Sequence, residues 1–211
     1  DKSAIEIFKK GDTTGIFQFE SEGMKKFLKD LKPENFNDIS SAIALYRPGP
    51  ASNIPLFIKR RQNLEKIDYI NPALEDILKE TYGIIVYQEQ IMLIAKKLAS
   101  YTLGEADILR RAMSKKKIEL LKQEEERFIN NSVKNGYTKE ESKEVYDLIL
   151  KFANYGFNKS HSICYSLIAY RMAYLKAYFP TYFYASLLKG VIGSEIKTIE
   201  YLNELKKINI K

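Results

Sequence analysis

The chain is poor in the residues that build disulfide frameworks and metal centres, because its 211 residues include one cysteine, Cys164, and one histidine, His161. A single cysteine excludes an intrachain disulfide framework and points to a reducing compartment. A structural zinc site takes about four ligands, so these two side chains would need carboxylates gathered from elsewhere. We therefore do not expect a zinc site.

Long hydrophobic runs and a secretory leader are missing as well. The most apolar stretch, Ile163 to Tyr170, is interrupted by Arg171 and falls well short of the roughly 20 residues that a membrane span requires. The sequence starts at Asp1 without a methionine and stops at Lys211 inside a helix-like pattern. We expect a piece of a longer polypeptide with no membrane partner.

Two catalytic motifs are also missing. No Asp-x-Asp pair supplies the close-set acids that two-metal phosphoryl transfer needs, and no Gly-x-Ser-x-Gly elbow occurs. Ser160, His161 and Ser162 are adjacent, whereas the members of a hydrolase triad come together from separate segments. The sequence alone therefore gives little support to a hydrolase.

What the sequence does contain is typical of a globular protein with an anionic partner. Hydrophobic residues make up 45% and charged residues 29%, which suits one sizeable core, or one main domain with a smaller appendage. There are 34 lysines and arginines against 27 acids, a net charge of +7. This excess favours a polyanion, although many basic proteins bind no nucleic acid.

Apolar spacing predicts a mostly α fold with short extended connectors. Met24, Phe27, Leu28 and Leu31 recur at steps of three and four residues, as one buried helical stripe does, and this helix ends before Pro33. Further helices are predicted over residues 37–46, 72–83, 88–99, 104–113, 118–135, 138–155, 160–179, 180–191 and 194–208.

Three details of that prediction can be checked individually. Asn37 is a candidate N-cap, and Thr138 with Glu141 has the spacing of a capping box. Residues 84–86 are β-branched but have no partner strand, so we expect an extended connector. Residues 160–179 are apolar almost all round, which predicts the central buried helix.

The first candidate site is a run of cations at the end of a predicted helix. Guanidinium forks beside lysine ammonium groups suit phosphate oxygens, because arginine matches their geometry and lysine adds a point charge. Taken alone, such a run fits better with a solvated patch that offsets the helix dipole. Its neighbours along the chain shift the balance toward phosphate binding. The cations are Arg110, Arg111, Lys115, Lys116 and Lys117.

The second candidate site is the segment 155–162, which leads into the most apolar helix. The start of a helix carries unpaired N–H groups and partial positive charge, and Lys159 with His161 would add to it, making an anion site. The alternative is that Asn158 or Ser160 simply caps the helix while His161 is half-buried and hydrogen-bonded. A cap alone does not explain two cations at this end of the dipole.

For two further segments the sequence allows either a ligand contact or a purely structural role. The Arg47-Pro48-Gly49-Pro50 turn could present Arg47 to a ligand, or only end one helix and aim the next. The segment 82–90 mixes two tyrosines with amides, which could contact nucleic-acid bases or pack in the core.

Read together, five ordered motifs resemble the C family of bacterial replicative DNA polymerases, the alpha subunits of DNA polymerase III. The motifs lie at residues 15–21, 47–50, 87–90, 109–117 and 155–162, so the resemblance runs through nearly the whole chain. It implies the fingers region, which closes on the incoming nucleotide against a palm that bears the catalytic carboxylates. The resemblance also implies a fingers domain over 1–190, with 191–211 beginning the next helical element.

The resemblance assigns roles to the candidate residues. Arg110, Arg111, Lys115, Lys159 and His161 would bind nucleotide phosphates. Arg47, Lys116, Lys117 and Asn158 would bind or position DNA. No metal or other cofactor is expected in this chain, while Mg²⁺ is expected for the parent enzyme.

The implied function is template-directed DNA synthesis by a DNA-directed DNA polymerase, a nucleotidyltransferase of the bacterial cytoplasm, with this chain inactive by itself. Implied partners are template-primer DNA, deoxynucleoside triphosphates, the palm of the same polypeptide and other replicase subunits. The rival hypothesis is a free-standing helical nucleic-acid-binding module, and a plain helical interaction scaffold is a third. Salt-sensitive DNA binding would separate the scaffold from the other two.

Overall fold

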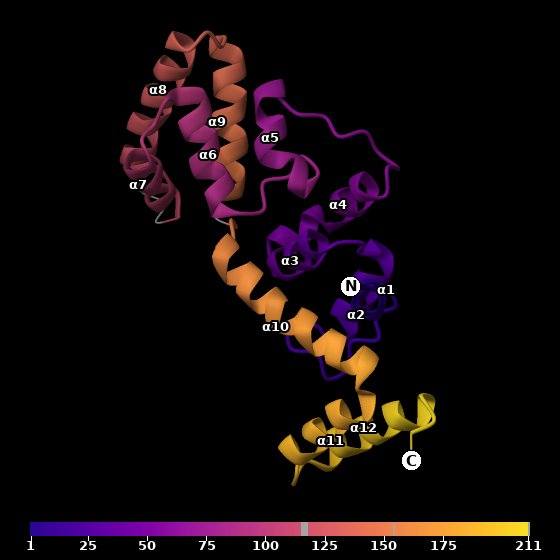
Figure 1. The fold of residues 1–211 in the computed structure, drawn as a ribbon. Helices are drawn as coiled ribbons and strands as arrows, with labels where there is room; N and C mark the ends of the chain where they lie inside the picture. The colour runs from indigo at the N-terminus through magenta and orange to yellow at the C-terminus, as the bar shows by residue number, and fades with distance from the viewer. Residues whose placement is uncertain (115–117, 154, 211) are drawn as a thin grey trace. The chain divides into compact units, whose positions relative to one another are not determined.

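The computed structural model describes residues 1–114, 118–153 and 155–210, which are mostly helical (Figure 1). The α-helices are α1 (Lys2–Lys9), α2 (Glu22–Leu31), α3 (Phe36–Leu45), α4 (Ile54–Arg61), α5 (Glu75–Leu78), α6 (Gln88–Ala99), α7 (Leu103–Ser114), α8 (Ile118–Lys134), α9 (Lys139–Ala153), α10 (Lys159–Tyr178), α11 (Pro180–Gly190) and α12 (Glu195–Lys207). Short 3-10 helices are η1 (Pro50–Asn53), η2 (Pro72–Leu74) and η3 (Lys79–Thr81). The predicted mostly α fold is confirmed.

Extended backbone is confined to connectors. In these residues the only β-type pairing is an isolated parallel bridge between Tyr87 and Phe157, so the predicted connector at 84–86 is confirmed. The helix predicted over 72–83 is present as the broken series η2, α5 and η3, and Tyr82 and Gly83 end it with positive φ.

Local capping chemistry fixes the starts of α2 and α9. The Ser21 hydroxyl accepts a hydrogen bond from the Met24 N–H, and α2 then runs to Leu31. The Thr138 N–H donates to Glu141 Oε2 at 2.8 Å, and the Glu141 N–H donates to Thr138 Oγ1 at 3.1 Å. The predicted capping box at the start of α9 is therefore confirmed.

The predicted N-cap at Asn37 is wrong. The Asp38 N–H donates to the side chain of Asn35 at 3.0 Å, and Asp38 Oδ2 accepts from the Glu34 N–H at 2.9 Å. These two bonds hold the start of α3 at Phe36, so the capping residue lies two positions earlier than predicted. Both asparagines suit a cap, and only the pairing with Asp38 selects Asn35.

The chain divides into two compact units. One comprises Asp1–Ile43 and Ile163–Lys211, and the other comprises Ala44–Ser162. The first unit is thus built from the two ends of the chain. The domain boundary expected after residue 190 stays a prediction.

In the Ala44–Ser162 unit, α6, α7, α8 and α9 pack side by side as a bundle (Figure 1). Its centre holds the rings of Tyr101, Phe128 and Tyr146, which contact one another edge-on or tilted. The two tyrosine hydroxyls are paired inside the bundle, Tyr101 with Glu124 and Tyr146 with the Leu121 carbonyl. Burial, together with the carboxylate of Glu124, raises the pKa of Tyr101.

In the other unit, α1 packs on α2 and α11 packs on α12. Phe8 of α1 meets Phe19 edge-on at 5.0 Å, and both rings are fully buried. Gly15 has φ of +79°, and a Cβ there would collide with the Leu187 side chain of α11. The positive φ favours glycine at this position, and a larger residue would also displace the end of the Leu187 side chain.

The prediction that residues 160–179 form the central buried helix is half wrong. They do form one helix, α10, but its buried positions are mainly small residues, and its bulky residues include many that are exposed. An all-round apolar pattern does not say which face will be buried, and small side chains allow the closest approach. The buried residues are Ser162, Ser166, Ala169, Ala173 and Lys176, and the exposed ones include Ile163, Leu167, Ile168 and Leu175.

Among the described residues, no helix combines the length and apolar character that crossing a bilayer demands, α10 included.

Candidate functional site

Several of the sequence motifs meet in the Ala44–Ser162 unit at the isolated bridge. The Phe157 N–H donates to the Val86 carbonyl, and the Gln88 N–H donates to the Phe157 carbonyl, each at 2.9 Å. These bonds join the segment before α6 to the segment before α10. They bring together two motifs that are about 70 residues apart in the sequence.

The N-terminus of α10 holds a carboxylate from within the chain. The Asn158 side chain accepts from the His161 N–H at 2.8 Å, as an N-cap does. Glu89 of α6 accepts from the Lys159 N–H at 2.9 Å through Oε2 and from Asn158 Nδ2 at 3.1 Å through Oε1. The anion expected at this helix start is therefore Glu89 in the described structure.

Lys159 is also paired with a carboxylate. Its ammonium group lies 2.6 Å and 2.8 Å from the two oxygens of Glu80, and 5.6 Å from the centre of the Tyr87 ring. Both members of the pair are partly exposed, so the interaction stays open to solvent. The imidazole of His161 meets the Phe157 ring edge-on at 5.4 Å.

Asp107 holds both arginines of α7. Its Oδ1 accepts from Arg110 Nη2 at 2.7 Å, and its Oδ2 lies 2.7 Å from Arg111 Nε. The hydrogen bond from Arg110 is the main reason that the pKa of Asp107 is lowered. Arg110 also donates to Gln88 Oε1 at 3.1 Å, which ties α7 to α6 beside the bridge. The Arg111 side chain is 67% exposed.

Arg47 contacts the 155–157 segment through both a hydrogen bond and stacking. Its Nε donates to the Ala44 carbonyl at 3.0 Å and its Nη2 donates to the Tyr155 carbonyl at 2.8 Å. The guanidinium stacks 4.4 Å from the centre of the Phe157 ring, and burial lowers the pKa of Arg47. This geometry supports the scaffold role, while a DNA contact by Arg47 stays a prediction.

The structure thus links five predicted site residues through Gln88, Glu89 and Phe157, and Arg111 joins them through Asp107. The five are Arg47, Arg110, Asn158, Lys159 and His161. Lys115, Lys116 and Lys117 lie outside the described residues.

Sequence reasoning missed the three carboxylates that bind these residues: Asp107 and Glu80 pair with cations, and Glu89 accepts from amides. Asp107 could have been found, because it precedes Arg110 and Arg111 by three and four residues, the spacing of helical ion pairs. Glu80 and Glu89 carry no such signal, since each is 70 or more residues from Lys159.

The side chain of Gln90 shows that part of the 82–90 segment packs in the core. Its side-chain oxygen accepts from the N–H groups of Val86 and Tyr87, each at 2.9 Å, and its nitrogen donates to Thr81 Oγ1 at 2.8 Å. This buried amide holds the connector in place. Gln90 therefore belongs to the core, whereas Gln88 faces Arg110.

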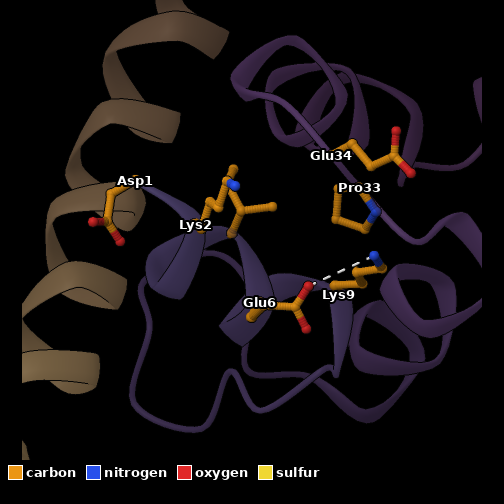
Figure 2. A pocket seen from close by; sticks show the side chains of 7 residues that line it. Asp1, Lys2, Glu6, Lys9, Pro33 and Glu34 are labelled. Carbon is orange, nitrogen blue, oxygen red and sulfur yellow. Dashed lines mark ion pairs between the residues drawn. The ribbon is translucent and has the colours of Figure 1, made fainter.

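Other hollows and acid clusters do not form a rival site. A hollow of about 530 Å³ in the other unit is lined by mixed charges, among them Lys9, which pairs with Glu6 at 3.6 Å (Figure 2). None of the predicted site residues lines it. Within the described ranges, no three histidine, cysteine or acidic side chains are grouped as a metal site requires.

Comparison with known families agrees with the resemblance read from the motifs. Residues 1–136 match the model of the bacterial DNA polymerase III alpha subunit finger domain. The chain belongs to this family. The finger-domain match covers α1 to α8 and so includes the Gln88–Arg110 contact and Asp107.

Curated relatives extend the similarity to the remaining helices. The chain is 53% identical over 210 residues to a DNA polymerase III subunit alpha from Staphylococcus aureus strain Mu50, and 54% identical over 206 residues to one from Staphylococcus epidermidis. All or nearly all of the chain is covered. It spans about a fifth of the length of these relatives, 20% and 19% respectively.

Proposed function

We propose that this finger-domain chain works in a DNA-directed DNA polymerase, where it holds the phosphates of the incoming deoxynucleoside triphosphate and the nearby template-primer. The observation that carries the proposal is the gathering of Arg110, Lys159 and His161 around one bridge, with Arg111 beside them. Three separate segments of the chain, 86–88, 107–111 and 157–161, contribute to it. Simple solvated charge does not require such convergence.

The chemistry of the cluster suits exchange of one anion for another. Lys159 and the two arginines already face oxygen anions, so their donors are oriented as phosphate binding needs. Partly exposed ion pairs contribute only about 0–1 kcal/mol, so phosphate oxygens can displace Glu80 or Asp107 at small cost. Glu89 keeps the backbone N–H of Lys159, which leaves side chains rather than the helix start for the phosphates.

The metal ions and the bond-forming step are assigned elsewhere. The acids nearest to the site, Glu80, Glu89 and Asp107, are each engaged by a cation or an amide, and they do not fit a two-metal centre. We therefore assign Mg²⁺, which DNA polymerases use when active, to carboxylates outside this chain. The role of this chain is to bind and orient.

The polymerase role is favoured over a free-standing nucleic-acid-binding module because the curated relatives are about five times longer than this chain. The palm of the same polypeptide, template-primer DNA and the nucleotide are the partners that the proposal requires. Other replicase subunits stay a prediction.

The test compares the 211-residue chain with the full-length subunit. We expect the chain to bind duplex DNA weakly and without sequence preference, with a negative slope of log affinity against log salt of about 0.9 per phosphate contact. We expect no primer extension by the chain with Mg²⁺ and four nucleotides. Binding that is flat between low and moderate salt, or extension above a control without protein, would overturn the proposal.

A further inference from the structure

The loop between α1 and α2 presents two side chains to solvent on a firmly held backbone. Ile16 and Phe19 are fully buried, while Phe17 and Gln18 between them are exposed. The Thr13 hydroxyl donates to the Phe19 carbonyl at 2.6 Å and closes the loop. The exposed pair is therefore displayed by an anchored turn.

A buried lysine fastens this loop to α10. The ammonium of Lys176 donates to the carbonyls of Asp12 at 2.6 Å and Thr14 at 2.9 Å, and the residue is 8% exposed. The Tyr184 ring lies 5.4 Å from the same ammonium. Burying a charge is costly unless it is fully paired. The Lys176 ammonium therefore favours the one loop conformation in which the Asp12 and Thr14 carbonyls both face it.

Phe17 carries an exposed ring in a defined orientation. Its side chain is 40% exposed, and its centre lies 5.2 Å from that of Tyr165 on α10, with 36° between the ring planes. The Phe17 ring is therefore supported on one side by Tyr165, and the rest of its surface is open to solvent. Flat, supported aromatic surfaces are what unpaired nucleobases stack on.

Gln18 occupies a backbone conformation that does not suit its side chain. Its φ is +70°, in the left-handed region where glycine has no penalty and asparagine has a small one. A residue with a long amide pays a local cost here. The cost is understandable if the exposed amide donates to and accepts from the edge of a base.

We propose that Phe17, supported by Tyr165, is a stacking platform for an unpaired nucleobase, and that Gln18 hydrogen-bonds the same base. The ligand is single-stranded nucleic acid, and the inference rests on the proposed function, which makes nucleic acid the partner. Lys176 is a positioning residue, because it acts only by holding the loop.

The experiment uses the full-length subunit and two fluorescent 12-nucleotide probes, oligo-dT and an abasic strand of the same length. Stacking contributes roughly 1–3 kcal/mol per base, which converts to about a fivefold to hundredfold change in affinity. We expect Phe17→Ala to weaken oligo-dT binding by about tenfold and to leave abasic binding unchanged. Phe17→Trp should keep the preference for oligo-dT.

Salt dependence separates stacking from charge. Because Phe17 carries no charge, the slope of log affinity against log salt for oligo-dT should be the same in Phe17→Ala as in the unchanged protein. Tyr182→Ala is the matched control, since Tyr182 is an exposed aromatic residue of α11 in the same unit. We expect it to bind both probes normally.

Gln18→Gly tests the amide without the risk of misfolding. Glycine relieves the left-handed strain, so a purely structural role predicts an equal or higher melting temperature and unchanged binding. Our proposal predicts the same or higher melting temperature together with severalfold weaker oligo-dT binding.

Other results of the Phe17→Ala experiment would contradict the stacking platform. Equal loss of oligo-dT and abasic binding in Phe17→Ala, or no loss of either, would overturn the stacking platform while leaving the proposed function intact. The second result would instead fit a loop that contacts another part of the polypeptide. Failure of the unchanged subunit to bind either strand would overturn the stacking platform, whereas the proposed function falls only with the salt and extension tests given above.

Discussion

In the Ala44–Ser162 unit, Lys159 meets the carboxylate of Glu80 at the surface, whereas in the other unit Lys176 is buried against two backbone carbonyl oxygens. The surface partner can rotate away when a competing anion arrives, but the carbonyls of Asp12 and Thr14 are fixed by the fold. A lysine with an exchangeable partner suits ligand binding. A lysine with fixed partners suits scaffolding.

The largest effect is expected for Arg111→Ala in the full-length subunit, because its side chain is more exposed to an incoming ligand than those of Arg110 and Lys159. A charge-assisted phosphate contact contributes about 1.5–3 kcal/mol, so polymerase activity should fall by about 10- to 100-fold. Loss of an exposed cation should change the free energy of unfolding by less than about 0.5 kcal/mol. Steady-state primer extension and urea unfolding give the two values.

The kinetic pattern identifies the ligand of Arg111. A contact to the incoming nucleotide should raise its KM or lower kcat, with little change in primer-template affinity, and a contact to DNA should show the reverse. Lys143→Ala is the matched control, since Lys143 is an exposed cation of the same unit that pairs with Asp147 on α9. Equal effects of the two substitutions would show that Arg111 only faces solvent.

The next effect concerns pH and the buried Lys176. Burial is the main cause that lowers its pKa to about 8, with Lys25 and Lys207 also lowering it and Glu204 and Asp12 opposing. In the unfolded chain a lysine pKa is about 10.4, so between these values the unfolded state holds more protons. The contribution of Lys176 to the free energy of unfolding should therefore rise with pH across this window.

This rise should amount to about 2 kcal/mol between pH 7.5 and pH 9.5, because each unit of pH contributes about 1.4 kcal/mol above the folded pKa. Below pH 8 both states keep the proton and the dependence disappears. Urea unfolding of the unchanged chain and of Lys176→Met at both pH values isolates the contribution of Lys176 to the free energy of unfolding. The prediction fails if the two proteins respond to pH in the same way.

A smaller effect is expected for Arg47→Ala. The substitution removes two hydrogen bonds to the carbonyls of Ala44 and Tyr155 and the stacking on Phe157. We expect a loss of about 1.5 kcal/mol in the free energy of unfolding, with the salt slope of DNA binding unchanged. A slope reduced by about one contact, with stability unaffected, would assign Arg47 to DNA instead.

A modest loss of stability is expected for Lys159→Ala. Its pair with Glu80 is about a third exposed on each side, so solvent screening limits the loss to about 1 kcal/mol or less. Polymerase activity should nevertheless fall, and Glu80→Gln should retain it, because only the lysine is proposed to bind phosphate. Equal losses of activity in the two variants would mean that the ion pair, not the cation, matters.

The helices could be predicted from local signals because those signals act within one turn. The stripe of Met24, Phe27 and Leu31 and the capping box at Thr138 each depend on residues three or four apart. The motifs also carried the family resemblance. All of this information is contained in the order of the residues.

The pairing of the site could not be predicted in the same way. That Glu89 occupies the start of α10, and that Glu80 holds Lys159, depends on contacts across 70 and 79 residues, which no periodicity encodes. The same holds for Lys176 and the carbonyls of Asp12 and Thr14.

The sequence by itself therefore determined the secondary structure, the cationic character and the family, because propensity, charge and motif order are properties of neighbouring residues. Only the tertiary structure decided which cations face an exchangeable carboxylate and which are buried. It also decided that α10 buries Ser166 and Ala169 while exposing Leu167 and Ile168. The reason is physical: burial and pairing depend on what the rest of the chain brings alongside each side chain.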